Sequence, residues 1–162
     1  MLKEKLNAVS DPLHILSPHH LGLPQTVSDS KAAAVCSSTP DTHRTVLLVE
    51  DDPVLRVVNH DLLENAGFDV DSAADGELGW QALRTKRYDL LVTDYDLPQL
   101  NGLQLVVRLR AQGLQLPVIL ASGSSELGAI SDYPELRLAA ILKKPIPFEV
   151  LIDTARTAVL VA

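Results

Sequence analysis

Short strand-like segments that alternate with helical patterns constrain the fold of this chain more than any other feature. Most of them are apolar along their whole length, which is typical of strands buried on both faces of a sheet. The segments cover residues 45–49, 68–70, 89–93, 117–121 and 139–142. Strands that alternate with helices form parallel sheets with helices on both faces, and right-handed crossovers restrict their topology. The sequence therefore predicts an α/β protein with a doubly wound, five-stranded parallel sheet in three layers.

Capping and turn residues place the expected helices between these strands. Asp52 and Pro53 fit an N-cap and the first helical position, and Asp75 fits the cap of a second helix. A weaker helix is expected after Ser124, and we interpret Asn101–Gly102 as a turn without a catalytic role. The expected apolar helix faces consist of Leu55, Val58 and Leu62; Leu78, Ala82 and Leu83; Leu103, Val106 and Val107; and Phe148, Leu151, Ile152, Ala155 and Val159.

The composition changes along the chain. Residues 1–42 hold four of the ten prolines and none of the six aromatic residues. No helical period continues between those prolines, so we expect this part to be a disordered N-terminal tail. Residues 43–162 carry the whole pattern of strands and helices and have the length of one ordinary domain.

Charge and cysteine content exclude several classes of protein. The chain has 14 Lys and Arg against 21 Asp and Glu, which gives a formal charge of −7. This acidity argues against a general binder of nucleic acid or anionic membranes. A single cysteine, Cys36, and the lack of an apolar run of about 18 residues fit a cytoplasmic protein without a transmembrane helix.

Side chains capable of chemistry follow the predicted strands. Glu50 and Asp51 come after the first strand and Asp94 after the third, while Ser122 and Lys144 follow the fourth and fifth. Ligands of open α/β sheets bind where the carboxyl ends of the strands meet, so we expect these side chains to share one site. Neither of the common glycine-rich phosphate-binding motifs occurs in the chain.

Carboxylates that converge at one edge of a sheet repel one another and need a cation. Oxygen ligands of this kind suit Mg²⁺. Once the charge is neutralised, an Asp oxygen can attack phosphorus and become an aspartyl phosphate. A Lys ammonium and a Ser hydroxyl can then stabilise the phosphoryl oxygens. The residues therefore suggest a phosphoryl-accepting aspartate.

Four blocks of sequence contain these residues and occur in a fixed order. The blocks are Val46–Pro53, Leu91–Gly102, Pro117–Gly123 and Leu142–Pro145. Together they resemble the receiver domain of the response regulators of two-component signalling, over residues 44–160. The resemblance implies a flavodoxin-like fold with strand order 2-1-3-4-5 and a receiver domain over residues 43–162.

The resemblance also implies a role for each matching residue. It makes Asp94 the phosphoacceptor, with Ser122 and Lys144 binding the phosphoryl group. The implied ligands of Mg²⁺ are Glu50, Asp51, Asp94 and the backbone carbonyl of Asp96. Each of these roles is an expectation carried over from the family pattern.

Some neighbouring positions leave alternatives or depart from the family pattern. Lys143 competes with Lys144 for the lysine position, and Asp52 competes for the metal, although its place before a proline favours a helix cap. The resemblance suggests a cis peptide bond before Pro145. Ile141 stands where many receivers have an aromatic residue, so the usual coupling between that residue and the hydroxyl is not expected.

The function implied is that of a stand-alone response regulator that is not an enzyme beyond the self-catalysed chemistry of its own aspartate. A histidine kinase or phosphotransfer protein would phosphorylate Asp94, and the phosphorylated surface would bind an unidentified downstream protein, without direct contact to nucleic acid or membrane. One alternative is an interaction module with a receiver fold that works without phosphorylation. Another is a hydrolase of the haloacid dehalogenase type, because Asp94–Asp96 fits its nucleophile motif, although the order of the other motifs disagrees.

Overall fold

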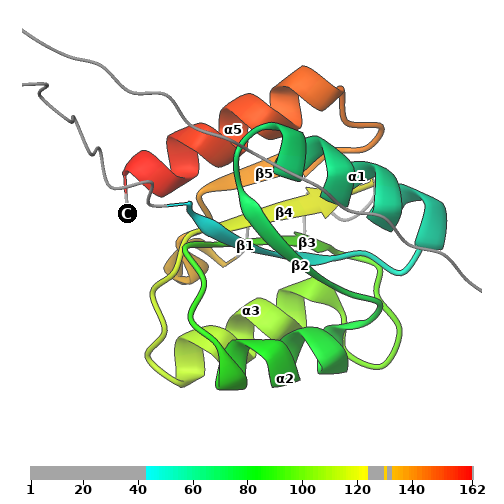
Figure 1. Ribbon diagram of the computed structural model, residues 1–162. Coiled ribbons are helices and arrows are strands. Elements are labelled where there is room, and N and C mark those ends of the chain that lie inside the picture. Colours follow the sequence, from blue (N-terminus) through cyan, green and yellow to red (C-terminus); the bar gives the residue numbers. More distant parts are fainter. Residues whose placement is uncertain (1–42, 124–129, 131–132, 162) are drawn as a thin grey trace, which may run out of the picture. The chain divides into compact units, whose positions relative to one another are not determined.

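A five-stranded parallel sheet forms the centre of the part of the chain that the structure describes (Figure 1). The computed structural model describes residues 43–123, 130 and 133–161, so the expected tail at 1–42 lies outside the described residues, as does most of the helix expected after Ser124. The strand order is β2-β1-β3-β4-β5, which confirms the predicted fold class. The strands are β1 Thr45–Val49, β2 Asp69–Ala73, β3 Leu90–Asp94, β4 Val118–Ser122 and β5 Ala140–Lys143.

Several predicted strands are wrong by a residue or more at their ends. The third and fourth strands end at Asp94 and Ser122, so these two residues belong to the strands instead of following them. The parallel ladder continues this far because Asp94 pairs with Ala121 and Ser122 pairs with Lys143. Two of the expected site residues are therefore fixed by backbone pairing inside the sheet.

Helices cover both faces of the sheet. Helices α1 and α5 lie on one face and α2 and α3 on the other (Figure 1). The α-helices among the described residues are α1 Pro53–Asn65, α2 Gly76–Thr85, α3 Gly102–Ala111 and α5 Phe148–Leu160, and a short 3₁₀ helix, η1, covers Pro134–Leu136. No helix in the described part of the chain is both long and apolar enough to cross a membrane.

Side-chain caps begin three of these helices. The Asp52 carboxylate accepts hydrogen bonds from the backbone of Val54 and Leu55 at 2.8 and 2.9 Å, and Asp75 caps α2 in the same way. These two caps are confirmed. The interpretation of Asn101 as a turn residue is wrong, because its side chain accepts from the Gln104 N–H at 2.8 Å and caps α3.

The core has one layer on each side of the sheet. Val46 and Leu48 pack toward α1 and α5, while Leu47 and Val49 pack toward α2 and α3, as the alternation of side chains along a strand requires. The spacing of apolar residues predicted that Leu62 of α1 faces the core. This prediction is wrong, since Leu63 is fully buried whereas Leu62 is only partly buried. Two adjacent leucines fit the same helical period, and only the packing on the sheet distinguishes them.

Four other residues of the expected helix faces are exposed, so their expected place in the core is wrong: Leu55, Leu78, Val107 and Phe148. Leu55 of α1 retains 43% of its accessible surface, and Phe148 of α5 retains 52%. Both lie in the first turn of their helix, at the edge where the strands end, so their side chains have no strand to pack against. The expectation that they belong to the core is therefore wrong, and they line a pocket instead.

Asp71 of the edge strand β2 forms an ion pair and a hydrogen bond that link its ionisation to folding. One carboxylate oxygen of Asp71 accepts from the Lys86 ammonium at 2.7 Å and the Tyr88 hydroxyl at 2.8 Å. These bonds lower the pKa of Asp71. A lowered pKa means that these bonds contribute stability above the unfolded-state value of 3.8 and that this stability is lost as the pH falls further.

We therefore expect Asp71→Asn to flatten the acid limb of the stability curve. Urea unfolding at about pH 5 and about pH 3 measures this, because near pH 3 the unfolded chain binds a proton at Asp71 more readily than the folded protein does. The wild type should lose more stability over this interval than the variant. An equal loss in both proteins would show that these bonds do not contribute.

Candidate functional site

Two buried carboxylates stand at the carboxyl edge of the sheet. Glu50, the residue after β1, is 4% exposed, and Asp94, the last residue of β3, is 6% exposed. The backbone N–H of Glu50 donates to the Ala73 carbonyl at 3.1 Å, which extends the pairing of β1 and β2 by one residue. The sheet thus presents both acids from adjacent strands in nearly rigid positions.

A third carboxylate joins them from the loop between β1 and α1. One oxygen from each of Glu50, Asp51 and Asp94 lies within 4.8 Å of the others. Asp51 is exposed, unlike the other two. Two like charges about 4 Å apart in a protein repel by about 4 kcal/mol, so this arrangement needs positive charge.

Lys144 supplies part of that charge. Its ammonium donates to Asp94 at 2.5 Å and to Glu50 at 3.3 Å. The following peptide bond, to Pro145, is cis, as the family resemblance suggested. The rival Lys143 belongs to β5 and is exposed, so the structure brings Lys144 to the acids and leaves Lys143 at the surface.

The local environment shifts the pKa of two of these groups. Burial raises the pKa of Glu50, and the nearby Asp94 carboxylate raises it further, while Lys144 acts in the opposite direction. Burial lowers the pKa of Lys144, but its hydrogen bonds and attraction to Asp94 and Glu50 outweigh this, and the net pKa is raised. Lys144 is therefore held as a cation among the acids.

The donor set fits a hard divalent cation. The three carboxylates and one ammonium carry a formal excess of two negative charges. Mg²⁺ prefers carboxylate oxygens together with water molecules. Asp51 is exposed, so water can reach this set of carboxylates. Asp52 is not part of this set, since its carboxylate caps α1. The hydrogen bonds that this carboxylate accepts from the backbone N–H groups of Leu55 and Val54 lower its pKa.

Two further expected residues lie beside the acids. Ser122 is fully buried at the end of β4, and its hydroxyl donates to the Gly123 carbonyl at 3.1 Å. The backbone N–H of Asp96 donates to a carboxylate oxygen of Asp94 at 3.3 Å. The expected metal contact of the Asp96 carbonyl and the phosphoryl contact of Ser122 stay predictions.

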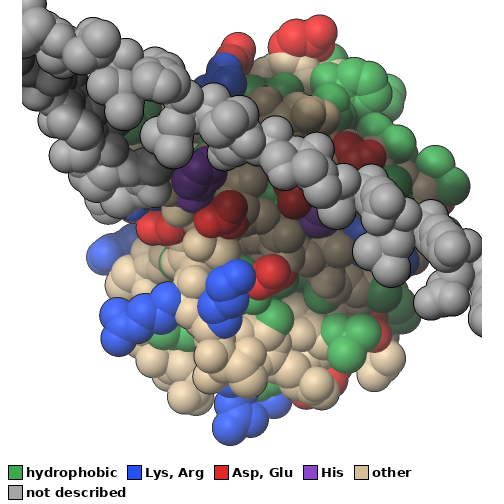
Figure 2. Space-filling view, viewed as in Figure 1, with side chains coloured by type: hydrophobic (Ala, Val, Ile, Leu, Met, Phe, Trp, Pro, Cys, Tyr) green, Lys and Arg blue, Asp and Glu red, His purple; other side chains and the backbone are tan. Residues whose placement is uncertain are grey.

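A pocket of about 570 Å³ opens beside Asp94, between α1 and α5. Glu50, Asp94 and Lys144 line its polar part, and Leu55 and Phe148 belong to its apolar lining. Hydrophobic side chains are visible over the beginnings of α1 and α5 in Figure 2. A molecule that approaches Asp94 from this side would therefore contact an apolar surface.

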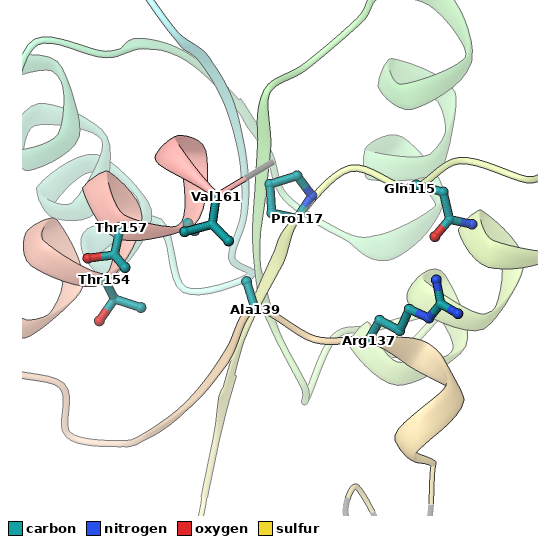
Figure 3. Close-up of a pocket in the computed structure, with 8 residues that line it drawn as sticks. Gln115, Pro117, Arg137, Ala139, Thr154, Thr157 and Val161 are labelled. Atoms are coloured by element: carbon teal, nitrogen blue, oxygen red, sulfur yellow. The ribbon is translucent and has the colours of Figure 1, made fainter.

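A second pocket, of about 300 Å³, lies at the opposite edge of the sheet (Figure 3). Thr154 and Thr157 of α5 and Val161, the residue after α5, lie on one side of it, and Gln115 and Arg137 lie on the other. None of the predicted site residues lines it. The chemistry expected from the sequence is thus concentrated at the carboxyl edge alone within the described residues.

Two residues near the acids were missed by the sequence analysis. Arg56 of α1 donates to the backbone carbonyls of Glu50 and Asp51 at 2.7 and 3.1 Å. Gly102, the first residue of α3, lies so close to Asp94 that an added Cβ would be 2.0 Å from the Asp94 carbonyl oxygen. The spacing of residue types in the sequence predicts neither contact, because each contact joins a side chain or a Cα to a backbone atom.

A family comparison decides what kind of domain this is. The family model described as the response regulator receiver domain matches residues 46–156. This chain belongs to the response regulator receiver family. Receiver domains accept phosphoryl groups in signalling and are not classical enzymes. Membership in this family removes the haloacid dehalogenase alternative.

Curated relatives of this receiver are longer proteins. RcaC of Microchaete diplosiphon is 42% identical over 84 residues, which are 52% of this chain and 13% of RcaC. The probable C4-dicarboxylate response regulator DctR of Priestia megaterium is 33% identical over 107 residues, or 65% of this chain and 47% of DctR. The chain thus spans less than half the length of these two relatives.

Solved receiver structures have the same fold. The receiver domain of the Francisella response regulator 1452 aligns with a TM-score of 0.69 and 26% identity, over 73% of this chain and 98% of that domain. Chemotaxis protein CheY4 of Vibrio cholerae aligns with a TM-score of 0.66 and 24% identity, over 72% of this chain and 98% of CheY4. At this identity the second likeness concerns the fold only.

Proposed function

We propose that this receiver accepts a phosphoryl group on Asp94 from a phosphorylated histidine of a kinase or phosphotransfer protein. Mg²⁺ would be held by Glu50, Asp51 and Asp94, with the Asp96 carbonyl as a further ligand. The observation that carries the proposal is the position of the Asp94 carboxylate, which is buried, close to the carboxylates of Glu50 and Asp51, and bonded to the Lys144 ammonium. An acid that served only as a helix cap or turn residue would need none of these contacts.

The transfer follows from the groups around Asp94. A carboxylate oxygen of Asp94 attacks phosphorus while the phosphorus–nitrogen bond of the phosphohistidine breaks, and the electron pair stays on the imidazole nitrogen, which takes up a proton. When bound, Mg²⁺ supplies positive charge that offsets the excess of the acids. Lys144 stays charged, and its ammonium turns from the carboxylate to an oxygen of the new phosphoryl group.

The phosphorylated state would act by shifting an equilibrium between two conformations. The phosphoryl group is a dianion near Ser122 and Lys144, and charge-assisted hydrogen bonds to both would favour the conformation that brings them inward. The surface formed by β5 and α5 would then bind a partner protein. Cys36, the only cysteine, supports a reducing cytoplasmic setting for this exchange.

Incubation with a small acyl phosphate tests the proposal without a cognate kinase. Intact-mass measurement of the wild type should find one added phosphoryl group with Mg²⁺ and none after the metal is chelated. Circular dichroism of the same samples checks that the protein stays folded in both. A folded protein that takes up no phosphoryl group with Mg²⁺ present would favour the phosphorylation-independent interaction module instead.

A further inference from the structure

Arg56 connects α1 to the backbone of the loop that carries two of the acids. Its guanidinium Nη1 donates to the Glu50 carbonyl at 2.7 Å and to the Asp51 carbonyl at 3.1 Å. Arg56 lies one turn into α1, and its main-chain N–H also donates to the Asp52 carbonyl at 2.9 Å. Three successive carbonyls of the loop are thus bonded to one residue.

These bonds restrain the backbone from which Glu50 and Asp51 extend. A carbonyl that is held in place fixes the peptide plane that follows its residue, and with it the local backbone from which the side chain extends. Glu50 is also held by burial and by pairing with Ala73. Asp51 is exposed, so packing contributes less to its position and the bond from Arg56 contributes more.

The charge of Arg56 acts in the same direction. A guanidinium beside two carbonyls lowers the electrostatic cost of holding the acidic loop in a single conformation. Its bonds go to main-chain oxygens and leave the carboxylates themselves available for a metal. Residues of this kind, which orient the ligands without touching the metal, commonly change metal affinity by about 10- to 100-fold when they are replaced.

We propose that Arg56 is a positioning residue that pre-organises Glu50 and Asp51 for binding Mg²⁺. The proposal rests on the function proposed above and adds a residue to it. Without Arg56, the loop would sample conformations in which the Asp51 carboxylate no longer lies close to those of Glu50 and Asp94. Replacement should therefore weaken metal binding and leave the phosphoacceptor itself competent.

Calorimetric titration of Mg²⁺ into the unphosphorylated protein tests this directly. Arg56→Met, which keeps an unbranched side chain but no donor, should raise the Kd for Mg²⁺ by about 10-fold or more. Uptake from a small acyl phosphate should be slow at low Mg²⁺ and return close to the wild-type rate when Mg²⁺ saturates. A variant that is impaired equally at all Mg²⁺ concentrations would overturn the positioning role.

A matched variant controls for the loss of an arginine that bonds a carbonyl near α1. Arg156 of α5 donates to the Ala66 carbonyl, at the far end of α1, at 3.4 Å. Arg156→Met should leave the Kd for Mg²⁺ unchanged. An increase in Kd as large as that of Arg56→Met would mean that general loosening of α1, and not the loop contact, controls the affinity.

Two further comparisons separate the possible failures. If the wild type itself does not bind Mg²⁺, the proposed function fails; if wild type and Arg56→Met bind equally, only the role of Arg56 fails. Arg56→Lys keeps the charge with fewer donors and should have an intermediate Kd. Should the Met variant not fold, the Lys variant decides the matter, and a wild-type Kd in it would overturn the proposal.

Discussion

Asp94→Asn is expected to reduce phosphoryl uptake from a small acyl phosphate to below detection. The amide has no nucleophilic carboxylate oxygen, so no acyl phosphate can form at this position. The side chain keeps its volume and can still accept a hydrogen bond from Lys144, and the loss of one buried negative charge removes repulsion with Glu50. The variant should therefore fold, and intact mass measures its uptake beside the wild type.

The neighbouring acid provides the control for this loss. Asp96 lies two residues further along the chain and is exposed, and only its backbone enters the proposed site. Asp96→Asn should still add one phosphoryl group, although its rate can change. Uptake that survives in Asp94→Asn and disappears in Asp96→Asn would reverse the assignment of the acceptor.

Gly102→Ala is expected to destabilise the protein and to slow phosphoryl uptake together. The new methyl group would lie 2.0 Å from the Asp94 carbonyl oxygen and 3.0 Å from the Leu120 side chain. The Asp94 oxygen is backbone within β3, so it cannot move without disturbing the strand or the start of α3. Overpacking of this kind costs about 3 kcal/mol, which urea unfolding can measure.

A remote glycine separates the effect on the acceptor from the effect on stability. Gly113, just past the C-terminal end of α3, has a φ of 75°, and an added Cβ would meet no atom within 4 Å. Gly113→Ala should cost about 1–2 kcal/mol through backbone strain alone. At temperatures where both variants stay folded, it should keep the wild-type uptake rate while Gly102→Ala does not. Equal rates in the two variants would contradict the role given to Gly102.

The sheet and its site edge were predictable because both depend on local patterns. Continuous apolar strands between capped helices specify a parallel sheet, and parallel strands end at one edge. It follows that Glu50, Asp94 and Lys144, more than 40 residues apart in sequence, converge in the structure. The order of the sequence blocks suggested the expected role of each residue. In the structure, Lys144 lies within hydrogen-bonding distance of Glu50 and Asp94.

The features that the sequence did not reveal depend on tertiary packing. Whether Leu62 or Leu63 faces the sheet depends on how α1 lies across it, and Leu55 is exposed because its turn lies beyond the strand ends. Arg56 and Gly102 act on backbone atoms of other segments. A pattern of side-chain types carries no information about such contacts until the elements are placed.

Mapping the phosphorylated residue of the wild type is the most direct measurement for the central claim. After incubation with Mg²⁺ and a small acyl phosphate, borohydride reduces an aspartyl phosphate to homoserine, which marks the acceptor permanently. Peptide mass spectrometry then locates it. Homoserine in place of Asp94, dependent on Mg²⁺, is the expected result. A mark on another acid, or an unmodified Asp94 in protein that has gained a phosphoryl group, would contradict the claim.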